Sequence, residues 1–266
     1  MHEFDESTDD LAWAIFRYAL DRVRTDPPLD GPRSHQELWE AVGQTITEEG
    51  LGGESVLAAF ADHLAPACLS TDHPRFLSFV PGAPTNASVL FDLVVGASAM
   101  CATSWLEAAG TVYAENQALR WVADLVGLPE GAGGCFASGG TMGNLSALIA
   151  GRDHAMRRRE ADGSGRPARW SVVASDGAHS SIDSAARVMD VDVLLATTGD
   201  DRRLRGEAVR AAIAARPEGT EVFAVVATAG TTNLGVVDAL DEVAEAAAEH
   251  GAWFHVDGAY GGAALA

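Results

Sequence analysis

The sequence predicts an α/β fold with a mostly parallel β-sheet, preceded by a helical N-terminal arm. From residue 170 onward, short runs rich in Val, Phe and Ala take turns with amphipathic helical segments. The apolar runs show no strict apolar–polar alternation, which is typical of parallel strands covered by helices on both faces. With 266 residues, 47% of them hydrophobic, the chain is long enough to bury a sizeable core.

The first 70 residues are expected to form the arm, and residues 71–266 a large domain. An amphipathic stretch over 11–23 follows two aspartates, and Pro27-Pro28 then breaks the helical pattern. Ser34 and Glu37 then have the spacing of a capping box, which predicts the start of a second helix. The arm carries so much charge that it is not expected to form a hydrophobic core of its own.

The large domain is predicted to begin with helices and to continue as alternating strands and helices. Helices are expected over 87–100, 114–125 and 141–158, with a short apolar strand over 135–137. The alternating part has expected strands over 170–174, 191–196, 221–227 and 252–256, and expected helices over 181–189, 205–216 and 240–250. This order is typical of parallel strands joined by helical crossovers.

Chemically useful side chains are predicted to gather at one edge of this sheet. In open parallel sheets, ligands bind beyond the carboxyl ends of the strands. Four groups follow predicted strands here, namely Gly139–Thr141, His179, Thr231–Thr232 and Asp257. Because the carboxyl ends of parallel strands meet at one edge, we expect a single site.

The glycine-rich turn from Ser138 to Asn144 leads from a predicted strand into a helix. Glycines let backbone N–H groups approach an anion, and the positive end of the helix holds it, so phosphate is the natural ligand. The same turn can also be a tight packing corner. It lacks the Gly-Lys-Ser/Thr ending of a P-loop, and Phe136 replaces the first glycine of a nucleophile elbow.

His179 and the Thr231–Thr232 pair each have two interpretations. An imidazole at position 179 can lie on a planar heteroaromatic ring and handle protons near a reacting carbon. Alternatively, Ser180 or Ser181 caps the following helix, and His179 is a hydrogen-bonded residue of the rim. The two threonines alone indicate only a strand-to-loop exit with hydroxyl groups, and they gain interest from their predicted neighbours.

Asp257 is the most informative residue of the chain. It closes the apolar run over 252–256, so its carboxylate is predicted at the end of a buried strand, where charge is costly without a cation or strong donors. His255 shares its strand face. A carboxylate beside a pyridinium nitrogen keeps the ring protonated and electron-withdrawing. A metal-binding pair or a loop-capping carboxylate are the alternatives; metal is disfavoured because no further Cys/His cluster has ligand spacing.

Composition limits the partners. A net charge of −20 and a pI near 4.6 argue against nucleic acid, which needs a basic face. No uncharged stretch of membrane-spanning length is apolar enough to predict a transmembrane helix, and the acidic N-terminus is not expected to be a secretory signal. Three widely spaced cysteines among apolar neighbours are expected to be reduced and packed, which favours a cytoplasmic protein.

Together these motifs resemble the group II pyridoxal-phosphate-dependent amino-acid decarboxylases, the family of aromatic-L-amino-acid, glutamate, histidine and diaminobutyrate decarboxylases. The resemblance runs from about residue 73 to the last residue and is carried by the segments 73–76, 104–107, 136–144, 176–181, 227–232 and 255–262. It implies a type I aminotransferase-like fold, a homodimer with sites at the subunit interface, and pyridoxal 5'-phosphate as cofactor.

The resemblance also implies a role for individual positions. Gly140 and Thr141 would hold the phosphate, and His179 would stack on the pyridine ring as a catalytic residue. Asp257, also catalytic, would pair with the ring nitrogen. The remaining implied positions are Thr232 near the ring substituents, Ala259 under the ring, and Phe79, Pro81 and Thr103 in the substrate pocket.

The expected reaction is decarboxylation of an L-amino acid to the amine and carbon dioxide. One departure matters, because all 18 residues counted as Lys+Arg are arginines and the family's Schiff-base lysine is missing. The chain is therefore expected to be a portion of the cofactor domain cut before that lysine, without the C-terminal small domain. An inactive fragment that binds the cofactor weakly or serves as a dimerisation half is one alternative. An aminotransferase or lyase of the same fold is another.

Overall fold

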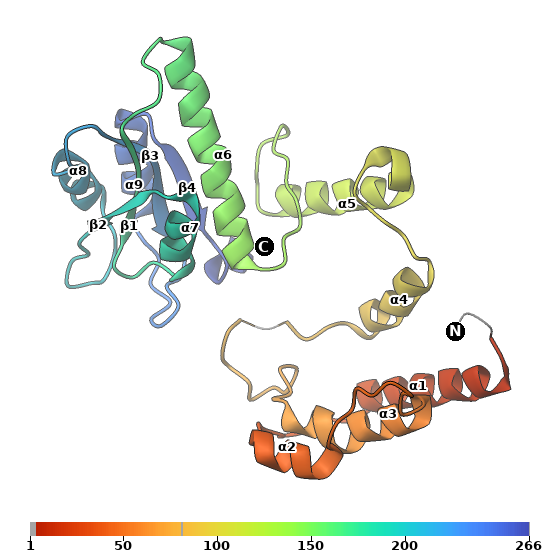
Figure 1. The fold of residues 1–266 in the computed structure, drawn as a ribbon. Coiled ribbons are helices and arrows are strands. Elements are labelled where there is room, and N and C mark those ends of the chain that lie inside the picture. The colour runs from red at the N-terminus through yellow and green to blue at the C-terminus, as the bar shows by residue number, and fades with distance from the viewer. Residues whose placement is uncertain (1–3, 81, 266) are drawn as a thin grey trace. The chain divides into compact units, whose positions relative to one another are not determined.

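The computed structural model describes residues 4–80 and 82–265 and divides the chain into two units, one up to Cys101 and one from Ala102 onward (Figure 1). The expected boundary of the arm at residue 70 stays a prediction.

The first unit is helical. Asp5 caps its first helix through a hydrogen bond from the Thr8 N–H at 2.9 Å. The capping box of Ser34 and Glu37 is confirmed, since each side chain bonds the backbone N–H of the other. None of the described residues of this unit is buried, as expected for a charged arm. Its helices are α1 (Glu6–Arg24), α2 (His35–Val42), α3 (Gly53–Ala59) and α4 (Asn86–Ala97), with short π and 3-10 turns at Phe60–Leu64 and Ala65–Ala67.

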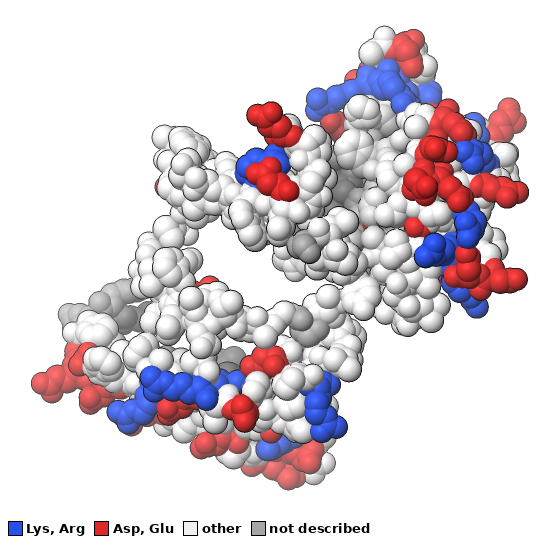
Figure 2. All heavy atoms as spheres, turned by 180° about the vertical axis from the view of Figure 1, so that it is seen from behind, with Lys and Arg blue, Asp and Glu red and all other residues white. Residues whose placement is uncertain are grey.

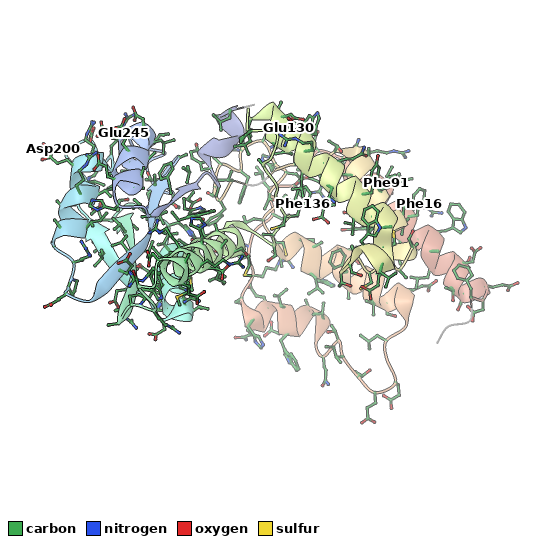
Figure 3. All side chains as sticks on the ribbon, turned by 90° about the horizontal axis from the view of Figure 1, so that it is seen from above. Phe16, Phe91, Glu130, Phe136, Asp200 and Glu245 are labelled. Atoms are coloured by element: carbon green, nitrogen blue, oxygen red, sulfur yellow. The ribbon has the colours of Figure 1, made fainter. Side chains whose placement is uncertain are left out.

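The second unit opens with two long helices, α5 (Trp105–Leu125) and α6 (Gly140–Ala161). α5 begins nearer the N-terminus than expected, because the Ser104 hydroxyl accepts the N–H of Glu107. The expected strand over 135–137 is wrong. Those residues pair with no strand among the described residues, and the Phe136 side chain is 64% exposed (Figure 3). An apolar run of three residues does not form a strand without a neighbour that accepts its hydrogen bonds.

The four strands predicted after residue 169 are confirmed. They form one parallel sheet in the order β2-β1-β3-β4. The helices between them are confirmed as well, to within a few residues at each end. The elements are β1 (Arg169–Ser175), α7 (Ser181–Met189), β2 (Asp192–Ala196), α8 (Gly206–Ala214), β3 (Thr220–Thr228), α9 (Leu240–Glu249), β4 (Trp253–Asp257) and a final 3-10 turn at Gly261–Leu265.

Helices cover both faces of this sheet, as Figure 1 shows. Ala224 and Val226 of β3 belong to a buried cluster with α6 and α7, whereas Val225 and Ala227 belong to a second cluster with α8 and α9. Successive strand residues point to opposite faces, which explains why an unbroken apolar run was the right signal for this strand.

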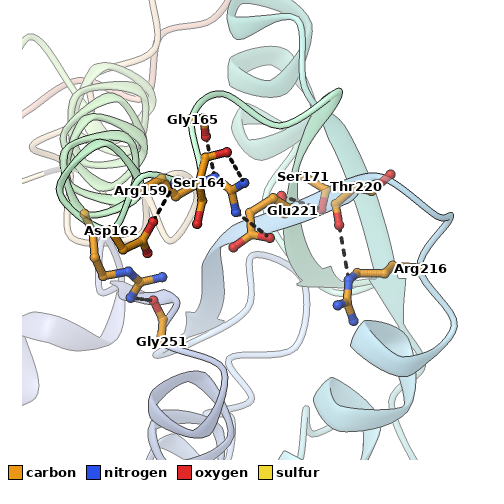
Figure 4. Close-up of polar contacts among 10 residues, drawn as sticks. Arg159, Asp162, Ser164, Gly165, Ser171, Arg216, Thr220, Glu221 and Gly251 are labelled. Atoms are coloured by element: carbon orange, nitrogen blue, oxygen red, sulfur yellow. Dashed lines mark hydrogen bonds and ion pairs between the residues drawn. The ribbon is translucent and has the colours of Figure 1, made fainter.

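Arginine side chains hold the edge of the sheet where the strands begin (Figure 4). Arg159 Nε donates to the Gly165 carbonyl at 2.7 Å, and its Nη1 lies 3.4 Å from Glu221 Oε2. Arg216 Nε donates to the Thr220 carbonyl at 3.2 Å. Because Thr220 and Glu221 open β3, these contacts fix the start of a central strand at the edge opposite the predicted site.

The surface of the second unit carries arginines among acidic side chains (Figure 2). One ion pair of this unit joins Arg210 Nε to Glu249 Oε2 at 2.7 Å. The expectation of packed thiols is wrong, since Cys68, Cys101 and Cys135 are all exposed. Within residues 4–80 and 82–265, every helix is too short or too polar to span a lipid bilayer.

Candidate active site

Asp257 lies at the carboxyl end of β4 and is 7% exposed. Its Oδ2 accepts a hydrogen bond from Asn144 Nδ2 at 2.9 Å, and its Oδ1 accepts one from the Ala259 N–H at 3.1 Å. Strong donors thus meet this carboxylate, which is one of the two conditions under which a buried charge is tolerated. No arginine of the described residues forms an ion pair with it, so no cation among those residues offsets its charge.

Asn144, in the second turn of α6, connects the residues of the site. It is 4% exposed, and its Nδ2 also donates to Ser181 Oγ at 2.9 Å. Its Oδ1 lies 2.7 Å from His255 Nε2. His255 and Asp257 thus lie on one face of β4, as predicted, and both contact the same amide. From the sequence, Asn144 was expected only as the last residue of the glycine-rich segment. A polar residue on the sheet-facing side of a helix was the signal that could have identified it.

His179 follows β1 and is exposed. Its Nδ1 accepts the N–H of Ser181 at 3.2 Å and lies 2.9 Å from Ser181 Oγ. Neither serine caps α7 in the way that was considered, since Ser180 is the N-cap residue but makes no side-chain cap bond. The Ser181 hydroxyl instead joins His179 to Asn144.

The start of α6 has the features of an anion site. Gly139, its N-cap residue, has φ +143°, a conformation that favours glycine, and no side chain caps the helix. A Cβ atom added at Gly140 would lie 3.3 Å from the Cβ of Ala259. The absence of a side chain at Gly140 therefore keeps this helix start close to the loop after Asp257. Thr141 is the next residue and is exposed.

A cleft of about 460 Å³ lies beyond the ends of β1, β2 and β3. His179 and Thr232 both line it, together with Thr198 and Arg202. Thr231 also lines the cleft but is largely buried, and its hydroxyl accepts the Val236 N–H at 3.1 Å. The predicted grouping is thus seen as two linked parts: the cleft with His179 and Thr232, and the hydrogen-bonded set around Asp257.

Two further polar residues shape this edge. Asp238 is 3% exposed and accepts the N–H groups of Leu204 at 2.8 Å and Thr228 at 2.7 Å. Burial raises the pKa of Asp238, although these two hydrogen bonds and Arg203 oppose the shift. Thr228 pairs with Asp257 across the sheet, and its buried Oγ1 has no hydrogen-bond partner among the described residues.

Burial also lowers the pKa of His255, and the negative charge of Asp257 opposes this shift. A lowered pKa favours the neutral imidazole. Since His255 Nε2 faces the Oδ1 acceptor of Asn144, the neutral ring carries its proton on that nitrogen.

The expected substrate residues fall in different parts of the chain. Phe79 belongs to the first unit, has φ +63° and is 90% exposed. Thr103 belongs to the second unit, where its hydroxyl bonds Glu107. Pro81 lies outside the described residues. The substrate assignment of all three stays a prediction.

A helix-covered parallel sheet with a buried, donor-held carboxylate defines an α/β domain whose carboxylate lies at the edge where such sheets bind ligands. Residues 36–266 match the pyridoxal-dependent decarboxylase conserved domain. The chain belongs to this family, which confirms the resemblance found in its sequence motifs.

The chain spans about half the length of the curated relatives it matches. It is 31% identical to the aromatic-L-amino-acid decarboxylase of Bacillus atrophaeus, over 86% of this chain and 47% of that protein. It is 33% identical to an L-2,4-diaminobutyrate decarboxylase of Rhizobium meliloti, over 97% and 54%. The structure of Oryza sativa TDC with PLP and tryptamine matches 99% of this chain and 60% of that one, with 26% identity and a TM-score of 0.85. The predicted type I fold is confirmed.

Proposed function

We propose that this chain forms the pyridoxal-phosphate pocket of a decarboxylase that converts an L-amino acid into the amine and carbon dioxide. The observation that carries the proposal is the Asp257 carboxylate, buried and held by two N–H donors but not matched by a cation among the described residues. A buried carboxylate of this kind attracts a cationic partner, and a protonated pyridine nitrogen supplies one.

The residues at this edge fit such a cofactor. The uncapped start of α6 suits a phosphate, with Gly140 and Thr141 as its first two residues. Thr228 Oγ1, buried beside Asp257 without a partner among the described residues, adds an unused polar group. We assign ring contacts to His179, Thr232 and Ala259 on the same reasoning, because the first two line one cleft and Ala259 contacts Asp257.

When bound, pyridoxal phosphate supplies a protonated ring that takes up electrons from the substrate carbon as carbon dioxide leaves. The residues of this chain would bind and orient the reactants. Asp257 would keep a proton on the ring nitrogen, since the charged form of a base is favoured beside a carboxylate. His179 would cover one face of the ring at the cleft and orient it.

Covalent attachment of the cofactor through a side chain needs a lysine, and none of the 266 residues is a lysine. This favours a second candidate function for the chain taken alone, namely reversible, non-covalent binding of pyridoxal phosphate without turnover. The decarboxylase proposal applies to the protein in which a lysine is available to the pocket.

We further propose a cytoplasmic homodimer. Helix α4 exposes several large apolar side chains, with Phe91 at 65% exposure (Figure 3). Exposed apolar surface that is large and contiguous marks an interface with another protein surface. Exposed thiols favour a reducing compartment. The other apolar residues of α4 are Leu90, Leu93, Val94 and Val95.

Because the chain has no lysine, Schiff bases with lysine side chains cannot obscure a measurement of non-covalent cofactor binding. Pyridoxal phosphate is titrated into this chain and followed by equilibrium dialysis, with borohydride reduction and mass spectrometry to detect any bond to the N-terminal amine. Asp257→Asn should weaken saturable binding at least about tenfold, since it removes a charged hydrogen-bonding partner. Asp200→Asn, at an exposed loop residue (Figure 3), is the matched control and should not change it. No saturable binding by the unaltered chain would contradict the proposal.

The reaction type is tested on protein from its native source. Release of labelled carbon dioxide from carboxyl-labelled amino acids is the expected result. Amino-group exchange with a 2-oxo acid and no carbon dioxide would instead identify an aminotransferase.

A further inference from the structure

The side-chain amide of Asn144 has only one orientation that satisfies its neighbours. Its Nδ2 lies 2.9 Å from Asp257 Oδ2, and an ionised carboxylate can only accept hydrogen bonds. Turning the amide round would place Oδ1 against that carboxylate and Nδ2 against His255. The NH₂ group therefore faces Asp257 and Ser181, and the carbonyl oxygen faces His255.

This orientation determines the direction of the next hydrogen bond. Because Asn144 donates to Ser181 Oγ, the single hydroxyl proton of Ser181 is left for His179 Nδ1, 2.9 Å away. The backbone N–H of Ser181 donates to the same nitrogen at 3.2 Å. Two donors thus point at Nδ1, which must be an acceptor. The neutral His179 ring then carries its proton on Nε2.

On the basis of the proposed function, we propose that Asn144 is a positioning residue that sets the protonation on both sides of the cofactor pocket. It holds the Asp257 carboxylate as a hydrogen-bond acceptor and, through Ser181, holds His179 as the neutral Nε2–H tautomer.

The two effects act together. Asp257 favours a positively charged ring nitrogen, whereas a cationic imidazolium lying on the same ring would disfavour it. A neutral His179 avoids that repulsion, and its Nε2–H remains as a donor for a ligand in the cleft. The charged groups that line the cleft beside His179 are Asp176 and Arg202, which lie 3.9 Å apart and offset each other.

The decisive measurement is the tautomer of each histidine, read from ring ¹⁵N–¹H correlation spectra of this chain without cofactor. His179 and His255 are assigned from the signals lost in His179→Gln and His255→Gln. In the unaltered chain, both rings should be Nε2–H tautomers. A His179 ring protonated mainly on Nδ1 would overturn the proposal.

Asn144→Asp tests the role of the amide with almost no change in shape. The new carboxylate accepts the Ser181 hydroxyl proton, so Ser181 Oγ turns a lone pair toward His179. The Nδ1-protonated form of His179 should then rise several-fold, and an unchanged His179 tautomer would count against the proposal. Asn116→Asp adds the same charge at an exposed position of α5 and should leave both rings unchanged.

Ser181→Ala keeps the experiment informative if Asn144→Asp does not fold. It deletes one buried hydroxyl but leaves the Asn144–Asp257 bond in place. His179 Nδ1 then keeps only the backbone N–H of residue 181 as a donor, so the Nδ1-protonated form of His179 should rise while His255 keeps its tautomer. If both rings stay as they are, the relay through Ser181 is wrong.

Pyridoxal-phosphate affinity separates this inference from the proposed function. Asn144→Asp should raise the dissociation constant at least about tenfold, because a second carboxylate beside Asp257 makes the two share a proton. If the unaltered chain binds no cofactor, the proposed function fails although the tautomer result stands. If it binds cofactor and His179 shows the other tautomer, the inference alone fails.

Discussion

Asn144 Nδ2 and Asp257 Oδ2 lie 2.9 Å apart, although the two residues are 113 positions apart in the sequence. The bond joins the first turns of α6 to the end of β4. The helix start that suits a phosphate and the carboxylate that suits a ring nitrogen are therefore held at a fixed separation by a direct contact. Preorganisation of this kind favours binding of a rigid, two-ended ligand.

Gly151 is expected to be essential for seating α6 on the sheet. A Cβ added there would lie 2.8 Å from Cγ of Trp253, the first residue of β4. Gly151→Ala should therefore destabilise the protein by about 1–3 kcal/mol, the usual range for overpacking. Urea unfolding followed by circular dichroism measures this.

Gly143 of the same helix provides the matched control. A Cβ at Gly143 meets nothing within 4 Å, so Gly143→Ala should stabilise α6 by about 0.5–1 kcal/mol through helix propensity alone. Equal effects of the two substitutions would show that the contact with Trp253 is not what limits residue 151.

Asp238→Asn should lower stability because both oxygens of Asp238 are used. Leu204 and Thr228 donate to them through backbone N–H groups, and an asparagine offers only one acceptor. One buried N–H would then face an NH₂ group, which costs about 1–3 kcal/mol. Asp200→Asn, the same change at an exposed residue, should stay within about 0.5 kcal/mol. Thermal unfolding of both variants and of the unaltered chain measures the two losses of stability. Equal losses would contradict the role given to Asp238.

The sequence was sufficient for the sheet because its signals were local. An apolar run such as 221–227, bounded by polar residues, predicts a buried strand whatever it packs against. Asp257 was found for the same reason, since a carboxylate at the end of such a run needs a partner. The contact with Asn144 was not predictable, because nothing local relates two residues on separate elements 113 positions apart.

The wrong expectations came from features that depend on distant chain segments. The run over 135–137 is apolar enough for a strand, but no described strand pairs with it. Cys68, Cys101 and Cys135 have apolar sequence neighbours and are nevertheless exposed. Apolar neighbours predict burial only when the element they form is itself covered.

The free energy of unfolding should decrease as the pH is lowered, and His255 should account for part of that decrease. Burial lowers the pKa of this histidine in the folded protein below its usual 6.5. Below about pH 6.5 the unfolded state therefore takes up the proton first, and the free energy of unfolding falls as the pH is lowered toward the folded pKa. Above pH 6.5 neither state holds the proton and the effect vanishes.

His255→Gln should remove this part of the pH dependence, since glutamine keeps an N–H donor for Asn144 but does not titrate. Urea midpoints at pH 7.5 and 5.5 should differ less in this variant than in the unaltered chain. His250→Gln, at an exposed residue next to α9, should leave the difference as it was. If the urea midpoint of His255→Gln fell more between pH 7.5 and 5.5 than that of the unaltered chain, the His255 effect would have the opposite sign. The His255 ring would then be charged in the folded protein.

Gly230 is expected to control the loop that carries Thr231 and Thr232. It has φ +99°, and a Cβ there would lie 2.6 Å from Cδ1 of Tyr260, in the loop after Asp257. Gly235 also has a positive φ, +65°, but its Cβ would lie 3.4 Å from the same ring, an ordinary contact.

Gly235→Ala should therefore cost about 1–2 kcal/mol from backbone conformation alone. Gly230→Ala should cost a further 1–3 kcal/mol or so from the clash. It should also weaken pyridoxal-phosphate binding more than Gly235→Ala, because moving Tyr260 displaces the loop whose N–H holds Asp257. Unfolding and dialysis measurements on both variants test this, and equal losses would mean that Tyr260 moves aside without disturbing the pocket.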